Sequence, residues 1–225
     1  MLLSMLQEGA SFRDILIQLI LIIPVILISL TFHEVAHGYI SYKLGDPTAY
    51  NLGRLSLNPV KHLDPIGSIC MLLFGVGWAK PVPVNARYYK KPKKGMALTA
   101  LAGPVMNLIL AFIGVIVCSG VIAFSMHLNI FNRWIEVIYL FFYFFSTMNV
   151  YLAIFNLLPI PPFDGSRILF VFLPTRVYFK VMKYERIIQF VILALLWTGI
   201  LTLPIGYISD WILTGMYSLV GLVIR

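Results

Sequence analysis

Residues 15–44 read ILIQLILIIPVILISLTFHEVAHGYISYKL, an apolar stretch with two histidines and a glutamate close to its C-terminal end. An apolar stretch of about 18 residues or more is long enough to cross a membrane as a helix. Ionisable side chains inside such a helix are costly, and they therefore indicate a functional site by default. The stretch predicts a membrane helix whose polar end carries chemistry.

The composition of the whole chain agrees with a membrane location. Of the 225 residues, 60% are hydrophobic and 12% are charged, and the mean hydropathy is +0.91. A soluble domain of this composition would have too little polar surface to cover itself. The first apolar stretch lacks the small-residue cleavage site of a signal peptide, so we expect it to stay in the mature protein. We expect residues 1–225 to form a single membrane domain.

Five stretches are long and apolar enough to be predicted as spans: residues 15–44, 97–124, 134–158, 187–203 and 208–224. A shorter apolar stretch, residues 65–79, contains three glycines that are unfavourable inside a helix, so we expect it to be re-entrant or interfacial. In residues 80–85, KPVPVN, alternate prolines exclude a regular helix and favour an irregular or edge strand. The predicted fold is an all-α polytopic membrane protein with about five spans and a re-entrant or β-hairpin-like segment.

Positive charge predicts the orientation of the chain in the cell membrane. The net charge is +8, and the cations cluster in two loops, which we expect to be cytoplasmic together with Arg225, while the N-terminus lies outside. Aromatic residues scarcely interleave with these cations, so we expect no nucleic-acid partner. The two clusters are Lys80, Arg87, Lys90, Lys91, Lys93 and Lys94, and Arg167, Arg176, Lys180, Lys183 and Arg186.

The residues His33-Glu34-Val-Ala-His37 place two imidazoles at positions i and i+4 on one face of a helix. Two neutral imidazoles at this spacing reach one tetrahedral zinc ion at about 2.0–2.1 Å, while the glutamate reaches a water on the metal. This is the HExxH arrangement of zinc proteases. We expect His33 and His37 to bind the metal and Glu34 to be the general base. Two alternatives are a polar cluster for helix packing and an ion or proton pathway.

A catalytic zinc ion usually has three protein ligands, so a third must come from elsewhere in the chain. Cys70 and Cys118 have no partner at metal-ligand spacing. Asp164 is the first candidate, because the prolines of residues 156–166, NLLPIPPFDGS, end the third predicted span at the cytoplasmic side. Alternatively, Asp164 or Ser166 caps a short helix over residues 167–173. His62 is the second candidate, but its basic neighbour and flanking prolines favour a solvated or interfacial loop histidine.

Two asparagines lie in apolar helices, where a side-chain amide needs a hydrogen-bond partner. Asn156 could donate to the oxyanion of a tetrahedral intermediate, orient the substrate, or hydrogen-bond to a neighbouring helix. Asn107 follows small residues that let another helix approach closely, so we expect it to serve packing. Asp46, between Gly45 and Pro47, is expected in the turn that ends the first helix.

Three patches together resemble the site-2 proteases, a family of intramembrane zinc metalloproteases. They are His33-Glu34-Val-Ala-His37, Ala102-Gly103-Pro104 with Asn107, and Asn156-x-x-Pro159-x-Pro161-x-x-Asp164-Gly165. The resemblance covers about the first 175 residues. It implies that Asp164 is the third zinc ligand, in a three-helix catalytic core near the cytoplasmic face. Residues 45–85 resemble the short bacterial and archaeal branch, which carries neither a PDZ nor a CBS domain.

The predicted function is hydrolysis of peptide bonds in transmembrane protein substrates, with one Zn²⁺ per chain and Glu34 as the base. A substrate helix must unwind first, because its carbonyls are engaged in hydrogen bonds. Residues 74–85 could offer an edge to which the unwound substrate adds as a strand, or could form an interfacial loop anchored by Trp78. Because the short branch carries neither a PDZ nor a CBS domain, we expect a separate membrane protein to regulate the protease. The alternatives are a catalytically idle scaffold and a metal or proton transporter.

Overall fold

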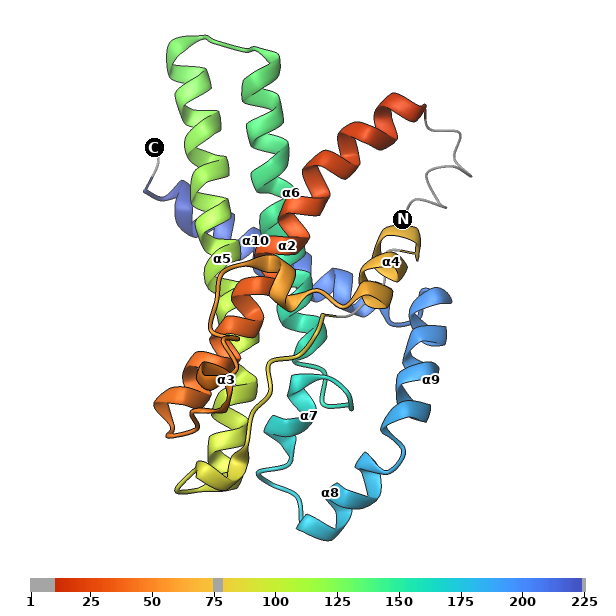
Figure 1. Cartoon of the computed structure of the whole chain (residues 1–225). Helices are drawn as coiled ribbons and strands as arrows, with labels where there is room; N and C mark the ends of the chain where they lie inside the picture. Colours follow the sequence, from red (N-terminus) through yellow and green to blue (C-terminus); the bar gives the residue numbers. More distant parts are fainter. Residues whose placement is uncertain (1–10, 75–78, 224–225) are drawn as a thin grey trace.

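Three long apolar helices form the centre of the computed structural model, which describes residues 11–74 and 79–223. They are α2 (Phe12–Lys43), α5 (Pro92–Leu128) and α6 (Arg133–Asn156), and within the described residues these three are long and apolar enough to cross a membrane. Figure 1 shows α5 and α6 as an antiparallel hairpin, with the C-terminal half of α2 beside it and its N-terminal half directed away. The helices coincide with the first three predicted spans.

Local signals set the ends of these helices. Helix α5 begins with Pro92, whose missing N–H is not needed in the first turn, and it ends before Asn129, which adopts a left-handed conformation (φ 52°). The N-cap of α6 is Asn132, whose side chain accepts hydrogen bonds from the N–H groups of Trp134 and Ile135, both at 3.0 Å. After α2 the chain turns at Gly45 (φ 102°), as its sequence predicts.

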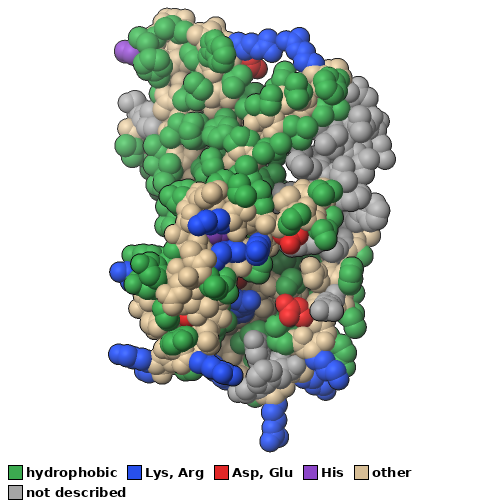
Figure 2. All heavy atoms as spheres, in the orientation of Figure 1, with side chains coloured by type: hydrophobic (Ala, Val, Ile, Leu, Met, Phe, Trp, Pro, Cys, Tyr) green, Lys and Arg blue, Asp and Glu red, His purple; other side chains and the backbone are tan. Residues whose placement is uncertain are grey.

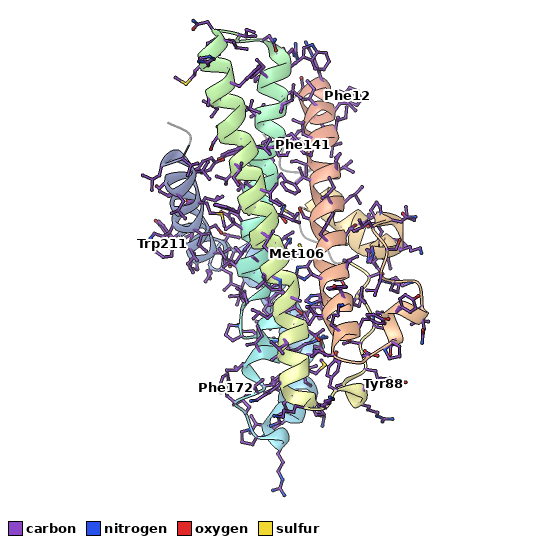
Figure 3. The ribbon with its side chains drawn as sticks, turned by 90° about the vertical axis from the view of Figure 1, so that its left-hand side faces the viewer. Phe12, Tyr88, Met106, Phe141, Phe172 and Trp211 are labelled. Carbon is purple, nitrogen blue, oxygen red and sulfur yellow. The ribbon has the colours of Figure 1, made fainter. Side chains whose placement is uncertain are left out.

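The helices pack through small clusters and expose apolar side chains outward. Val25 of α2, Leu110 of α5 and Phe145 of α6 form one buried cluster. On the outer face of α5, Ile109, Ile113 and Ile116 are between 44% and 48% exposed. Figure 3 shows Phe12 and Trp211 also pointing away from the bundle. Helices that are apolar on both their packed and their outer faces are typical of a membrane protein.

The C-terminal part differs from the two additional spans that the sequence predicts. After α8 (Thr175–Met182), α9 (Glu185–Trp197) is an apolar helix of 13 residues, shorter than a spanning helix. Helix α10 (Thr202–Gly221) has 20 residues, and its Ile205, Leu213 and Val220 pack against α5 and α6. Figure 1 shows α10 running across the hairpin rather than along it.

Between α2 and α5 lie short elements: α3 (Thr48–Asn51), η1 (Pro59–His62), α4 (Pro65–Phe74) and η2 (Ala86–Tyr88). Within the stretch predicted to be re-entrant or interfacial, residues 65–74 form the helix α4 despite Gly67, and with 10 residues this helix is too short to cross a membrane. Residues 75–78 of the same stretch, which include Trp78, lie outside the described residues. Residues 80–85 are not helical, as predicted, and in the described part an isolated antiparallel bridge joins Leu63 to Ala79.

Charge is distributed unevenly along the long axis of the molecule. In Figure 2 the Lys and Arg side chains lie mainly in the lower half, whereas the upper half is largely hydrophobic. The lower end contains the start of α5, α7 (Asp164–Leu169) and α8 (Figure 1). The two basic loops therefore lie at the same end of the bundle, as their prediction as cytoplasmic loops requires.

Candidate metal centre

Helix α2 and the start of α7 bring together three candidate metal ligands. The Nε2 atoms of His33 and His37 lie 3.0 Å apart, because residues at i and i+4 share a helix face. Oδ2 of Asp164 lies 3.2 Å from Nε2 of His33 and 3.1 Å from Nε2 of His37. The two histidines are buried, and Asp164 is mostly buried. The structure therefore groups the three residues that the sequence proposes as ligands.

Asp164 reaches the histidines because the chain reverses sharply after α6. Gly165 makes this reversal close: a Cβ at this position would lie 2.2 Å from the Leu157 carbonyl oxygen. The alternative of a capping role for Asp164 or Ser166 is not observed. Asp164 is the first residue of α7, its carboxylate points to the histidines, and the Ser166 hydroxyl donates to the Phe163 carbonyl at 2.7 Å.

The second nitrogen of each imidazole faces an oxygen that can only accept. Nδ1 of His33 donates to Oδ1 of Asn107 at 2.5 Å, and Nδ1 of His37 donates to the backbone carbonyl of Thr99 at 2.6 Å. Such partners fix the tautomer and the ring orientation of a metal-binding histidine. The expectation that Asn107 serves packing is therefore incomplete, because its side chain also orients His33.

With both Nδ1 atoms protonated, the lone pairs of the two Nε2 atoms and a carboxylate oxygen converge on one point. Two nitrogen lone pairs and a carboxylate oxygen repel one another, so they lie about 3 Å apart only when a cation lies between them. This cation can be a proton or a metal ion. The observed separations of 3.0–3.2 Å are close to the roughly 3.4 Å between ligands that are 2.0–2.1 Å from a tetrahedral zinc ion. The donor set therefore fits zinc.

Helix α5 supplies the opposite wall of the site from residues four positions apart. Thr99, Gly103 and Asn107 share one face of the helix. Gly103 leaves the space that the rings occupy, since a Cβ there would lie 2.5 Å from Cε1 of His33 and from Nε2 of His37. Polar and small residues at this spacing in an otherwise apolar helix are a sequence signal that could have revealed this wall.

Glu34 and Asn156 line the same cavity as the three candidate ligands, and its volume is about 580 Å³. Residues 80–85, which we call the extended segment, hold the Glu34 carboxylate at the edge of the cavity. The backbone N–H of Val82 in this segment donates to Oε2 of Glu34 at 2.7 Å. The Asn156 amide donates to the Leu152 carbonyl of its own helix at 3.0 Å, not to a neighbouring helix. Both side chains are thus available beside the candidate ligands.

His62 lies apart from this group, and the prediction that it is a solvated loop histidine is wrong. It is 1% exposed, and its Nε2 donates to the Ser56 carbonyl at 2.7 Å. The loop after α2 folds back over this side chain, which a reading of local sequence does not capture.

The electrostatics of the site favour an anionic Asp164. Burial raises the pKa of this carboxyl, but when no metal is bound and the imidazoles are protonated, the hydrogen bonds and charges of His33 and His37 lower it by more, to well below its ordinary range. A carboxylate that stays ionised in a buried site is suited to bind a cation.

A buried group of two histidines and one carboxylate, held by apolar helices and accompanied by the glutamate of an HExxH motif, defines a zinc metallopeptidase of the membrane. The chain belongs to peptidase family M50, the family of the site-2 proteases, whose model matches residues 21–199. Zinc is therefore the metal of this protein, and His33, His37 and Asp164 are the candidate residues to hold it.

Known relatives agree with this assignment. The chain is 47% identical over 161 residues to "Putative zinc metalloprotease YwhC" of Bacillus subtilis, a match that covers 71% of this chain and 72% of the relative. It is 32% identical over 139 residues to "Putative zinc metalloprotease MJ0611" of Methanocaldococcus jannaschii, covering 61% and 63%. It is 29% identical over 154 residues to "Putative zinc metalloprotease Rip2" of Mycolicibacterium smegmatis, covering 65% and 54%. No solved structure gives a significant match.

Proposed function

We propose that this metalloprotease hydrolyses peptide bonds of transmembrane protein substrates within the bilayer. The observation that carries the proposal is the cavity itself, in which the ligand group, Glu34 and the extended segment meet. Part of its wall comes from α2, α5 and the end of α6, the three helices of the described chain that are long and apolar enough to cross a membrane. A peptide that reaches this cavity must do so at the level of the membrane helices.

Each residue of the cavity has a proposed role. His33, His37 and Asp164 would hold the zinc ion, which would polarise the scissile carbonyl and acidify a water molecule. Glu34 takes the proton from that water and delivers it to the leaving amine. The hydrogen bond from Val82 keeps this carboxylate at the cavity while it changes protonation state. Asn156 uses its remaining amide hydrogen to donate to the developing oxyanion.

The extended segment offers a means of holding the substrate. Residues 81–84 line the cavity, and within the described chain the N–H of Val84 has no hydrogen-bond acceptor. A substrate strand that paired with this segment would regain part of the hydrogen bonding that is lost when its helix unwinds. Helix α9 lies across the cavity from the segment through Glu185, Gln189 and Ile192. An unwound substrate would then lie between the two.

We also propose that the centre lies near the cytoplasmic face of the cell membrane. One basic cluster lies before and at the start of α5, and the other lies on and between α7, α8 and α9. The Lys and Arg side chains gather in the lower half of the molecule, which supports this orientation (Figure 2). Partners in this setting are the bilayer, the transmembrane substrate and a regulatory membrane protein.

The decisive experiment compares the purified full chain with Glu34→Gln, using a model transmembrane substrate and a metal assay. Wild type should hold about one zinc ion and cleave. Glu34→Gln should keep the metal and lose about 10²- to 10⁴-fold in rate, because a general base is removed without a ligand. Activity comparable to that of wild type in Glu34→Gln would contradict the mechanism.

Two further variants test the ligand assignment in the same assay. Asp164→Ala should lose the metal, whereas His62→Ala should keep it, because His62 lies outside the ligand group. The reverse pattern would transfer the third-ligand role to His62. Zinc bound by a wild type that cleaves nothing would favour an idle scaffold, and zinc movement across proteoliposomes would favour a transporter.

A further inference from the structure

A chain of buried polar side chains extends from His33 away from the cavity, into the interior of the helix bundle. It runs through Asn107 of α5 and Asn149 of α6 to Ser29 of α2, and all three of these residues are fully buried. Met106, labelled in Figure 3, marks its level on α5. Side-chain amides in apolar surroundings are costly unless paired, and these amides bind one another across three helices. Asn149 and Ser29 are neither proposed zinc ligands nor the proposed general base.

The direction of every hydrogen bond in this chain follows from backbone carbonyls, which can only accept: those of Val25, Phe145 and Ser29. The Ser29 hydroxyl donates to the Val25 carbonyl at 2.7 Å, so its oxygen must accept from Asn149. Nδ2 of Asn149 donates to that oxygen at 2.8 Å and to the Phe145 carbonyl at 2.8 Å. Because a carbonyl only accepts, the nitrogen of this amide must face these two partners and its oxygen must face the other way.

The same logic continues to the metal centre. Nδ2 of Asn107 donates to Oδ1 of Asn149 at 2.7 Å and, over a longer distance of 3.4 Å, to the Ser29 backbone carbonyl. The shorter bond to Asn149 is the main one, and together they turn Oδ1 of Asn107 toward Nδ1 of His33. His33 must then carry its proton on Nδ1. If the Asn107 amide were reversed, two amide oxygens would face each other, and His33 would carry its proton on Nε2, the nitrogen that faces the other ligands.

We propose that Asn149, supported by Ser29, is a positioning residue for the metal centre: it fixes the orientation of the Asn107 amide and thereby keeps Nε2 of His33 free to bind zinc. The proposal rests on the role of His33 as a metal ligand in the proposed function. His37 has no part in this chain, because its Nδ1 donates to the Thr99 carbonyl. The two histidines are thus oriented by independent means.

The first test measures the zinc dissociation constant of the full chain in detergent, by competition with a chromophoric chelator. Asn149→Leu keeps the size of the side chain and removes its polar atoms. It should weaken zinc binding about tenfold, the lower end of the loss that follows removal of an outer partner of a metal ligand. Ser29→Ala removes one acceptor and should weaken binding about threefold, as expected for one hydrogen bond of modest net value. Ser29→Ala also tests the proposal if the Asn149→Leu protein does not fold.

Ser146→Ala is the matched control. Ser146 lies on α6 close to Asn149 and is equally buried, but its hydroxyl donates only to the Phe142 carbonyl of its own helix at 2.8 Å. It should bind zinc as wild type does. Wild-type affinity in both Asn149→Leu and Ser29→Ala, or an equal loss in Ser146→Ala, would overturn the proposal.

A second test separates positioning from a general loss of structure. Asn149→Leu should weaken zinc binding in the wild-type background and should add no further loss in an Asn107→Leu background, where the link to His33 is already removed. An equal effect in both backgrounds would overturn the proposal. Both tests measure metal binding, so a failure of the positioning proposal is distinct from a failure of the proposed function. A wild type that binds zinc but does not cleave would overturn only the proposed peptidase activity.

Discussion

Gly103 shows how a single missing side chain makes the metal centre possible. The two imidazoles of α2 lie against the backbone of α5 at this position, and a methyl group there would be within 2.5 Å of both rings. Contacts this short cannot be accommodated without moving one ring, and both rings are held at Nδ1. The close approach of the two helices and the geometry of the ligands therefore depend on the same residue.

We predict that Gly103→Ala loses most of its bound zinc while the protein remains in the membrane. The added methyl group would displace His33 or His37 by more than the roughly 0.2 Å that metal coordination tolerates. The metal content of the purified variant, determined by mass spectrometry, checks this. Gly120→Ala, on the same helix but with no atom within 4 Å of the added Cβ, should keep its zinc. A full complement of zinc in Gly103→Ala would contradict the prediction.

At the scale of elements, the shape of the extended segment depends on contacts with residues that are distant in the sequence. The Lys80 N–H donates to the His62 carbonyl at 2.9 Å, and the Arg54 guanidinium donates to the Lys80 carbonyl at 2.7 Å. The Asn85 N–H donates to Asp46 at 2.6 Å. These contacts hold the segment open beside the cavity, where prolines alone would only exclude a helix.

Val84 gives the sharper test of strand pairing with the substrate. Val82→Pro would also remove the hydrogen bond to Glu34, so a loss of cleavage there has two causes. Val84→Pro removes an N–H that no described residue accepts, and it should lower cleavage at least several-fold with zinc retained, while Val84→Ala stays close to wild type. The comparison uses initial rates on one model substrate. Equal rates for the two variants would leave this segment an anchoring role only.

Asp46 ties the end of α2 to this segment and makes stability depend on pH. It accepts hydrogen bonds from Ser41, Thr48 and Asn85, including a short one from the Thr48 hydroxyl. Burial raises the pKa of Asp46, but the hydrogen bonds from Thr48, Asn85 and Ser41 lower it by more, to below its ordinary value of 3.8. The folded state therefore binds the proton more weakly than the unfolded chain does.

A carboxyl whose pKa is lowered by folding stabilises the folded state at pH values above its pKa in the unfolded chain. This stabilisation is lost as the pH falls through the pKa of the carboxyl in the folded protein. We predict that the thermal unfolding midpoint of the wild type, in detergent, falls as the pH drops below 3.8. In Asp46→Asn the midpoint should be lower near neutral pH and should change less in that acidic range. Parallel curves for the two proteins would show that Asp46 does not contribute to the dependence.

At the scale of the whole molecule, the metal centre lies closer to the basic end of the bundle than to the opposite end. His33 and His37 are in the last turns of α2, and Asp164 begins the helix that follows α6. Both elements end at the side where the Lys and Arg side chains gather (Figures 1 and 2). Orientation in the membrane therefore decides the side from which the cavity is reached.

Labelling of single cysteines in whole cells tests this orientation. With Cys70 and Cys118 replaced, His127→Cys at the end of α5 should react with a membrane-impermeant maleimide. Lys90→Cys, in the basic loop before α5, should react only after the cells are permeabilised. Both positions are exposed, so a difference reports the side of the membrane rather than burial. Labelling of Lys90→Cys in intact cells would reverse the topology.

Local patterns in the sequence determined much of this protein. The apolar stretches predict α2, α5 and α6, and the turn at Gly45 and the non-helical residues 80–85 follow from glycine and proline. The spacing of His33 and His37 predicts a shared helix face, and the structure brings Asp164 to it. Apart from the approach of Asp164, which is a tertiary contact, these features depend on neighbours within a few residues, and backbone geometry fixes them directly.

Other features were decided only by the tertiary structure. The burial of His62, the partner of Asn107, the direction of the Asn149 amide and the course of α10 across the hairpin each depend on how distant segments meet. The α4 helix formed although its glycine disfavours one. Sequence periodicity gives the apolar face of a helix, but it does not give the rotation and depth at which two helices pack. A hydrogen bond between residues 74 or 42 positions apart depends on both.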